Sequence, residues 1–214
     1  MDEDEGPVLY GAPYSVYVRA ARLALAEKGV AYRLVPVDVF APGGPPAEYL
    51  ERHPFGRIPA FEHRGFRLYE TGAITRYVDE VFSGPALQPA SPEARARVNQ
   101  AIGVLDAYAY RTLVWDIYVE QVVAPARGRE PDEARIRAAL PRAVTCLGAL
   151  QQIMGPGPHL AGGALTLADL HAAPMFACFA TAPAAGPLLA AHPRLGRWWE
   201  SIAGRPSMTA TAVA

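Results

Sequence analysis

The sequence has little cysteine, no long apolar run and no surplus of charge of either sign. Its two cysteines, Cys146 and Cys178, are far apart and fit neither a disulfide framework nor a CxxC pair, so we expect no metal and no dithiol chemistry. Twenty basic residues stand against 21 acidic ones, which gives a net charge of −1. Because no positive field would gather a phosphate backbone, nucleic acid is not an expected partner.

Two further absences concern membranes. No apolar run approaches the ~18 to 20 residues that cross a bilayer. The acidic start, residues 1–5, is the opposite of the basic region of a signal peptide. We therefore expect a cytoplasmic protein with no membrane partner. What is present is a hydrophobic share of 51% with 19% charged residues over 214 residues, which is typical of a globular chain with one large or two small domains.

The first part of the chain alternates strand and helix signals. Residues 8–10 form a short apolar run that predicts a strand, and the apolar spacing from Ser15 to Gly29 predicts a helix. Residues 32–37 are β-branched and aromatic and predict a second strand. Strand, helix and strand of this length predict a parallel pair with a right-handed crossover.

A loop and a hairpin follow. Residues 41–46, Ala-Pro-Gly-Gly-Pro-Pro, can be neither helix nor strand, since proline removes donors and glycine adds entropy. Residues 60–62 and 66–69 flank a short glycine-containing connection and predict an antiparallel hairpin. Thr71 is then predicted to cap a helix with one apolar side.

The second part of the chain carries only helical signals. Ser91 is an N-cap candidate followed by proline at the first helical position. Helices are predicted near residues 92–125, 132–154, 167–181 and 193–203. We expect two domains, residues 1–84 and residues 91–214, joined near residues 83–91.

Five local motifs occur in order along this frame: LYGAPYS at residues 9–15, HPFGRIPAF at residues 53–61, LYETGAITRY at residues 68–77, LTLADL at residues 165–170 and PRLGRWW at residues 193–199. Together they resemble the glutathione S-transferases over nearly the whole chain, and are most similar to the phi and theta type that uses a serine. The resemblance implies an α/β thioredoxin-like N-terminal domain with a mixed four-stranded sheet, followed by an all-α C-terminal domain.

The resemblance also implies an enzyme that conjugates glutathione, its co-substrate, to small hydrophobic electrophiles. The glutathione thiol has a pKa of about 8.5, and only the thiolate attacks. Lowering that pKa by about two units takes ~2.7 kcal/mol, which one hydroxyl donor at a helix N-terminus can supply. Ser15 stands at that position as the expected catalytic residue, and a role as N-cap is compatible with it. Tyr14 is the alternative hydroxyl. Residues 12–15 carry no sulfur, so a mixed disulfide with the protein is excluded there.

Further residues are assigned to glutathione by the resemblance. Pro59 would follow a cis bond, and the Ile58 backbone would pair with the cysteinyl part of the tripeptide. Glu70 and Thr71 would hold the γ-glutamyl end through a carboxylate, a hydroxyl and the donors of a helix N-terminus. Taken alone, Glu70 and Thr71 would be only a capped helix start.

The sequence departs from its relatives at the glycine end of glutathione. Where phi-type relatives place a His-Lys pair, this chain has Gly44 and Pro45, which supply no cation. Arg57 or His53 could substitute, and Arg57 is the stronger candidate because a guanidinium stays charged and meets both carboxylate oxygens. Arg19 could add positive potential near Ser15 or be a plain surface arginine.

For the electrophile, the resemblance suggests Tyr14, Tyr108, Arg111 and Trp115. Such an aromatic stripe also suits a core or a dimer contact. Thr166 and Asp169 have the spacing of a capping box, so Asp169 is expected to be structural. We expect a homodimer. Two alternative functions stay open: a glutathione-dependent peroxidase or dehalogenase, and a non-catalytic ligand-binding protein on the same fold.

Overall fold

A computed structural model describes residues 6–212 of the chain. Its contacts divide the chain into two units. The first comprises the residues up to Ala86 together with the segment from Pro206 onward, and the second comprises Leu87–Arg205. From the sequence we expected residues 91–214 to form one all-helical domain. The contacts instead group the segment from Pro206 onward with the first unit.

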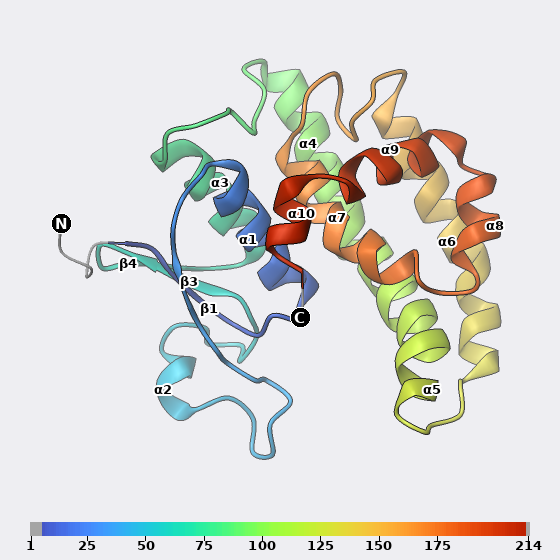
Figure 1. The fold of residues 1–214 in the computed structure, drawn as a ribbon, viewed down its shortest axis with the longest axis horizontal. Coiled ribbons are helices and arrows are strands. Elements are labelled where there is room, and N and C mark those ends of the chain that lie inside the picture. Colours follow the sequence, from blue (N-terminus) through green and yellow to red (C-terminus); the bar gives the residue numbers. More distant parts are fainter. Residues whose placement is uncertain (1–5, 213–214) are drawn as a thin grey trace. The chain divides into compact units, whose positions relative to one another are not determined.

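The first unit contains a four-stranded mixed sheet (Figure 1). Its strands are β1 (Val8–Tyr10), β2 (Arg33–Val35), β3 (Ala60–His63) and β4 (Phe66–Tyr69), in the order β2-β1-β3-β4. β1 pairs in parallel with β2 and antiparallel with β3, and β3 pairs antiparallel with β4. The predicted parallel pair and hairpin are therefore confirmed.

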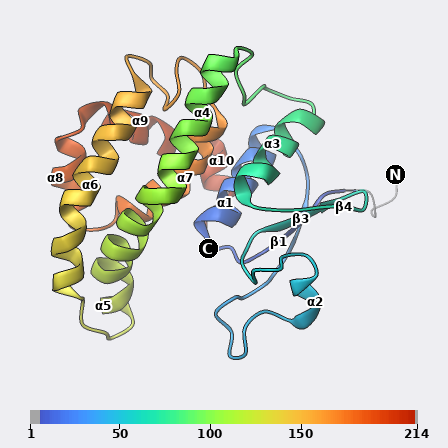
Figure 2. The same cartoon turned by 180° about the vertical axis from the view of Figure 1, so that it is seen from behind.

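Helices α1 (Val16–Glu27) and α3 (Thr71–Val81) lie together on one face of this sheet, as both ribbon views show (Figure 1 and Figure 2). Residues 20–25 of α1 contribute much of the buried core. The other face is covered by α2 (Ala47–Leu50), which the sequence analysis missed. Its Tyr49 is buried against residues of β3 and of the chain after β2, so tertiary packing supports this single turn.

The predicted cap of α3 is corrected by the structure. Glu70, not Thr71, is the N-cap residue, and its side chain makes no capping hydrogen bond. Thr71 is the first residue of the helix and is buried. The Glu70 side chain therefore does not cap the helix, and its carboxylate can bind another group.

A short C-terminal helix, α10 (Pro206–Ala210), packs on α1 within the first unit. Arg19 donates from Nη2 to the Met208 carbonyl oxygen at 2.9 Å and from Nε to Thr211 Oγ1 at 3.4 Å. Arg22 donates to the Thr211 carbonyl oxygen at 3.1 Å. Arg19 is thus not a plain surface arginine, because its guanidinium donates to a carbonyl oxygen and to a hydroxyl oxygen at the end of α10.

The only lysine of the chain is buried in the first unit. The Lys28 ammonium is 3.1 Å from Asp79 Oδ1, and the two side chains are 3% and 7% exposed. Lys28 also donates to the carbonyl oxygens of Asp79 and Pro85. Since a buried ammonium requires several acceptors, these contacts fix the end of α3 and the chain that leaves the unit.

The second unit has no strand among the described residues and consists of helices: α4 (Pro92–Val104), η1 (Leu105–Val123), α5 (Ala124–Ala126), α6 (Glu133–Met154), α7 (Leu167–Phe179), α8 (Ala185–Ala190) and α9 (Pro193–Ala203). The four predicted helical regions are present, and α8 was missed. Residues 105–123 form a π-helix, whose wider turn the α-helical periodicity did not predict. No helix in the described part of the chain has the length and apolar character needed to cross a membrane.

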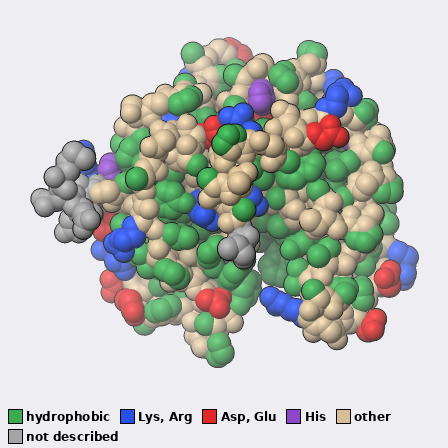
Figure 3. Space-filling model, viewed as in Figure 1, with side chains coloured by type: hydrophobic (Ala, Val, Ile, Leu, Met, Phe, Trp, Pro, Cys, Tyr) green, Lys and Arg blue, Asp and Glu red, His purple; other side chains and the backbone are tan. Residues whose placement is uncertain are grey.

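Buried acidic groups, Asp169 and Asp116 among them, organise the second unit. Asp169 is fully buried and accepts from the backbone N–H groups of Leu160 and Thr166 and from Trp198 Nε1, so its structural role is confirmed. Asp116 accepts from three arginines, at positions 111, 135 and 142. On the face shown in Figure 3, basic and acidic side chains are interspersed, in agreement with the balanced net charge.

Candidate functional site

Ser15 lies at the point where the chain leaves β1 and enters α1. It is the N-cap residue, with φ −75° and ψ 126°, and its Oγ accepts a hydrogen bond from the Val18 N–H at 3.4 Å. An oxygen that accepts from the helix still has its own proton to donate. The half-buried Ser15 hydroxyl is therefore available as a donor to a ligand atom at the start of α1.

Gly11 allows the close approach that shapes this entrance. A Cβ atom at Gly11, where φ is +156°, would lie 2.4 Å from a methyl group of Val18 and 3.3 Å from the Ile58 Cβ. Only glycine can therefore bring the end of β1 against both α1 and the segment before β3. This packing places Ile58 beside the segment that leads to Ser15.

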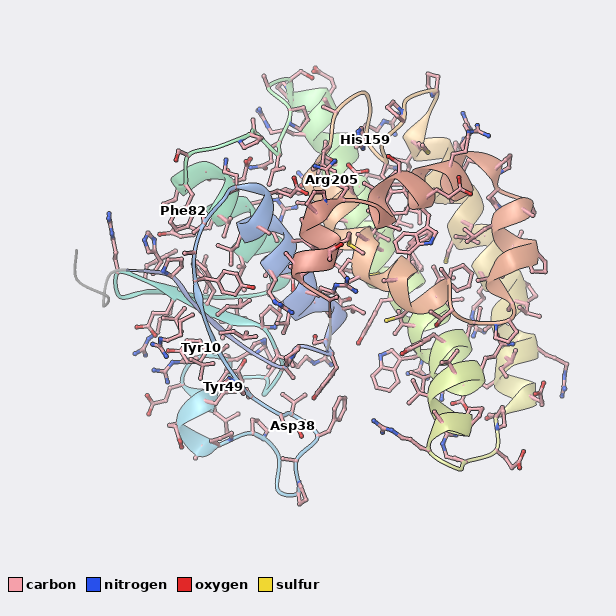
Figure 4. The ribbon with its side chains drawn as sticks, in the orientation of Figure 1. Tyr10, Asp38, Tyr49, Phe82, His159 and Arg205 are labelled. Carbon is pink, nitrogen blue, oxygen red and sulfur yellow. The ribbon has the colours of Figure 1, made fainter. Side chains whose placement is uncertain are left out.

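Tyr14 is not available as a hydroxyl donor. Its Oη donates to Asp38 Oδ1 at 2.8 Å. This carboxylate oxygen of Asp38 also accepts a hydrogen bond from the Phe40 N–H at 2.9 Å. Burial, followed by the hydrogen bond to Asp38 and the Asp38 charge, raises the pKa of Tyr14 to about 12. Figure 4 labels Asp38 on the segment that follows β2. The sequence analysis missed Asp38 and Phe40, since no local pattern connects them to Tyr14.

A pocket of about 390 Å³ lies in the first unit and is lined by Phe55, Arg57 and Glu70. The guanidinium of Arg57 and the carboxylate of Glu70 form no ion pair with each other or with another described residue. A cation and an anion that face one pocket without being paired are suited to a ligand that carries both charges.

The backbone at Glu70 supports this arrangement. Glu70 has φ +70° and ψ 115°, a region that a non-glycine residue enters at a cost of about 1–3 kcal/mol. The following helix leaves free N–H groups at its first turn, as every α-helix does. Glu70, which lines the pocket, therefore directly precedes the free N–H groups at the start of α3.

The segment between Arg57 and β3 carries the expected proline. The Ile58–Pro59 peptide bond is cis, which confirms the expectation. The Tyr49 hydroxyl donates to the Arg57 carbonyl oxygen at 2.7 Å and ties this segment to α2. Tyr10 and Tyr49, which pack with ring centroids 6.5 Å apart, are both labelled in Figure 4.

The loop at residues 41–46 contains Gly44 and Pro45 and no charged side chain. The next arginine, Arg52, is engaged elsewhere: its guanidinium lies 3.5 Å from Glu62 and 4.8 Å from the centre of the Tyr10 ring. His53 is buried among aromatic rings, and burial, modified by the charges of Glu70 and Arg57, lowers its pKa. A neutral, buried imidazole is a weaker substitute for a cation than a guanidinium, so Arg57 stays the stronger of the two candidates.

The three residues suggested on the second unit lie on η1. Tyr108 is 63% exposed, Arg111 pairs with Asp116 through Nε at 3.0 Å, and Trp115 packs edge-on against Tyr110. Their spacing assumed an α-helix, whereas the wider π turn changes which residues share a face. A role of Tyr108, Arg111 and Trp115 in binding the electrophile stays a prediction.

Metal binding has no support in the described residues, among which no three histidine, cysteine, aspartate or glutamate side chains are grouped as ligands. The pKa of Cys146, the buried cysteine, is raised by burial, so its thiol is not activated as a nucleophile or ligand. The site must therefore be judged on Ser15, Arg57, Glu70 and their neighbours.

Comparison with known proteins identifies the family. The model "Glutathione S-transferase, N-terminal domain" matches residues 9–86, and "Glutathione S-transferase, C-terminal domain" matches residues 112–206. The chain is 30% identical to glutathione S-transferase F13 of Arabidopsis thaliana over 201 residues, which cover 93% of this chain and 91% of the relative.

Solved structures agree with the sequence comparison. The structure of glutathione S-transferase III in apo form matches with a TM-score of 0.84 and 31% identity, over 96% of this chain and 95% of that one. Glutathione S-transferase I from maize, in complex with an atrazine glutathione conjugate, matches with a TM-score of 0.83 and 28% identity, over 96% of each chain. The chain belongs to the glutathione S-transferase family.

Proposed function

We propose that this glutathione transferase joins the thiolate of glutathione to small hydrophobic electrophiles, with Ser15 as the catalytic residue. The observation that carries the proposal is the Ser15 hydroxyl at the mouth of α1, which accepts from the helix and keeps its proton. The maize relative, whose structure contains a glutathione conjugate, supports conjugation as the reaction.

The chemistry required of Ser15 is modest. A hydroxyl that donates to a charged sulfur contributes about 1.5–3 kcal/mol, and the N-terminus of a helix contributes about 0.3–1 kcal/mol. Together they reach the ~2.7 kcal/mol that lowers a thiol pKa by about two units. The thiolate then attacks the electrophilic carbon, a carbon–sulfur bond forms and the leaving group departs with its electron pair. Proximity of the two bound reactants supplies the remaining acceleration.

Glutathione would lie along the start of β3 and the start of α3. The Glu70 carboxylate suits the γ-glutamyl ammonium, and the N-terminus of α3 with Thr71 suits the adjacent carboxylate. The Ile58 backbone would pair with the cysteinyl residue. Arg57, unpaired in the pocket, is the cation available to a second carboxylate.

The same proposal includes a homodimer in the cytoplasm that acts in detoxification. Exposed apolar side chains on the first unit support an interface: Phe55 is 69% exposed, Phe66 49% and Val81 48%. Sedimentation should give about twice the monomer mass of 22.9 kDa at micromolar concentration. A mass near that of the monomer would contradict the dimer.

Retention on glutathione-agarose followed by an electrophile panel tests the function. We expect retention, elution by free glutathione and conjugation of an aryl halide. A hydroperoxide and a haloalkane belong in the same panel, because turnover confined to one of them would assign peroxidase or dehalogenase activity. Retention without turnover of any acceptor would indicate a binding protein.

A further inference from the structure

We propose that the thiol site binds the γ-glutamyl and cysteinyl parts of its co-substrate and leaves the part after the cysteine unbound. Its thiol substrates are then a class, γ-glutamylcysteine and its C-terminal derivatives, of which glutathione is one member. The inference rests on the proposed conjugation reaction and names the class of thiol. Arg57 is available to either carboxylate of glutathione, and its place beside Glu70 assigns it to the γ-glutamyl one.

The pocket in the first unit holds a cation and an anion together. Arg57 and Glu70 line the same pocket of about 390 Å³ and form no ion pair with each other. The free amino-acid end of a γ-glutamyl group carries an ammonium and a carboxylate on one carbon atom, so it requires an anion and a cation at one place. The glycine end carries a carboxylate alone and would have no use for Glu70. The two charges of the pocket therefore match the γ-glutamyl end.

The buried ring of His53 lies near both of these charges. His53 is 2% exposed, and burial is the main cause that lowers its pKa, while the Glu70 charge raises that pKa and the Arg57 charge lowers it. The imidazole packs with the rings of Phe55 and Tyr69 at centroid distances of 6.3 and 5.0 Å. Phe55 also lines the pocket. Both charged groups thus act near one imidazole, as a single subsite for a doubly charged group requires.

The helix after Glu70 completes this subsite. Glu70 directly precedes α3, and the first turn of that helix leaves backbone N–H groups free. These N–H groups and the Arg57 guanidinium both favour a carboxylate. The γ-glutamyl carboxylate then has donors of two kinds, and the Glu70 carboxylate is the acceptor for the ammonium beside it.

The loop that packs next to Arg57 carries no charge. A Cβ atom at Gly56, where φ is +61°, would lie 3.5 Å from Pro45 Cγ, so the loop at residues 41–46 lies against the residue before Arg57. That loop has no charged side chain. In glutathione the cysteine lies between the two ends, so a molecule with its γ-glutamyl end in the pocket and its sulfur at Ser15 extends its glycine away from the pocket. The neighbouring loop offers the glycine carboxylate no charged partner there.

The other cations in the described part of the first unit are engaged or lie at the far end of the sheet. Most have acceptors: Arg19 and Arg22 at the C-terminal segment, Lys28 at Asp79, Arg52 and Arg67 at Glu62, and Arg76 at the Gly72 carbonyl. Arg33 pairs with Val8, the first residue of β1, and Arg64 lies in the turn between β3 and β4, whereas Ser15 follows the last residue of β1. With Arg57 committed to the γ-glutamyl end, the described residues of this unit supply no cation to the glycine carboxylate.

The first test compares thiols with the wild-type enzyme and one aryl halide as acceptor. Glutathione, γ-glutamylcysteine and the glycine amide of glutathione should give kcat/KM values within about threefold of one another, because each keeps the γ-glutamyl end. N-acetylglutathione, whose ammonium is blocked, should fall about five- to a hundredfold below them. A preference of about five- to a hundredfold for glutathione over both γ-glutamylcysteine and the amide would overturn the inference.

Variants then test the assignment of Arg57. Arg57→Ala should lower kcat/KM for all three γ-glutamyl thiols by the same factor, about five- to a hundredfold, through a raised KM. Arg57→Lys returns a cation and should restore part of the loss. Arg33→Ala removes an exposed arginine at the other end of the sheet and is the matched control, which should behave as wild type. A loss in Arg57→Ala that is confined to glutathione would place Arg57 at the glycine carboxylate and overturn the inference.

Calorimetric binding separates the thiol class from the proposed function. Wild type that binds glutathione and γ-glutamylcysteine with equal affinity but conjugates neither would overturn the conjugation reaction and still support the thiol class. Wild type that conjugates glutathione but binds γ-glutamylcysteine more weakly by about fivefold or more would overturn the thiol class alone. Wild type that binds no γ-glutamyl thiol would overturn both.

Discussion

Replacing Ser15 with alanine removes one oxygen that the structure uses at the start of α1 and that the proposed reaction uses on the thiolate. The Oγ accepts from the Val18 N–H at 3.4 Å, so the substitution affects stability as well as chemistry. Loss of an N-cap hydroxyl costs about 0.5–2 kcal/mol of folding free energy. Loss of ~2 kcal/mol of thiolate stabilisation slows turnover roughly thirtyfold.

The two effects can be separated because the chain contains a second serine cap with the same geometry. Ser91, the N-cap of α4, has φ −76° and ψ 143°, and its Oγ accepts from the Ala94 N–H at 3.1 Å. Ser91→Ala should cost a similar free energy of unfolding and leave turnover unchanged. Ser15→Ala should lose turnover and keep most of its affinity for glutathione, because the hydroxyl acts mainly on the sulfur.

The assay is steady-state conjugation of an aryl halide at saturating glutathione, together with calorimetric binding of glutathione and urea unfolding of both variants. Turnover of Ser15→Ala within about twofold of wild type would refute the catalytic role, since that is far less than the change that ~2 kcal/mol requires. An equal loss of turnover in Ser91→Ala would show that loss of a helix cap alone explains the effect.

Three further predictions follow from charged groups. Arg57→Ala should weaken glutathione binding about five- to a hundredfold. Calorimetry with glutathione and its glycine amide tells which carboxylate Arg57 meets: if it is the glycine carboxylate, wild type prefers glutathione and the variant loses that preference. Undiminished binding of both ligands by the variant would refute a role of Arg57 in binding. Lys28→Met should lower the free energy of unfolding by about 3–5 kcal/mol, because the buried Asp79 carboxylate loses its ammonium partner. The double variant Lys28→Met/Asp79→Leu should recover part of that loss in urea unfolding. An unchanged urea midpoint in Lys28→Met would contradict the importance of the ion pair. Burial alone would raise the pKa of Glu120, but the Asp132 N–H and the guanidinium groups of Arg129 and Arg135 outweigh it and hold that pKa low. The ionised Glu120 carboxylate therefore stabilises the folded state above the unfolded pKa of about 4.3, and this stabilisation is lost as the pH falls below it. Glu120→Gln should be less stable than wild type at neutral pH, by a difference in unfolding free energy that shrinks in acid. A difference independent of pH would contradict this.

Local patterns were enough to predict most of the secondary structure. The apolar run at residues 8–10 and the glycine-containing connection between β3 and β4 gave the strands, because each element follows from the chain's own turn and propensity signals. The missed helix α2 follows two prolines and is stabilised by burial of Tyr49, which no local periodicity shows. The π geometry of η1 had no sequence signal, since it differs from an α-helix only in which carbonyl each N–H meets.

The candidate site was predictable where a residue's role depends on its place in a motif. Ser15 at the helix start and Glu70 before α3 belong to this class. Contacts between distant segments were not predictable. The Tyr14 hydrogen bond to Asp38 and the bonds of Arg19 to the end of α10 depend on how the elements pack, and they changed the interpretation of both Tyr14 and Arg19.

The central claim is that the Ser15 hydroxyl at the mouth of α1 lowers the pKa of the glutathione thiol, and a thiolate absorbance titration of bound glutathione tests it most directly. In wild type we expect a midpoint about two units below the ordinary thiol value of about 8.5, and in Ser15→Ala a midpoint that returns most of the way to that value. A wild-type midpoint equal to that of free glutathione, or one that Ser15→Ala leaves unchanged, would contradict the account.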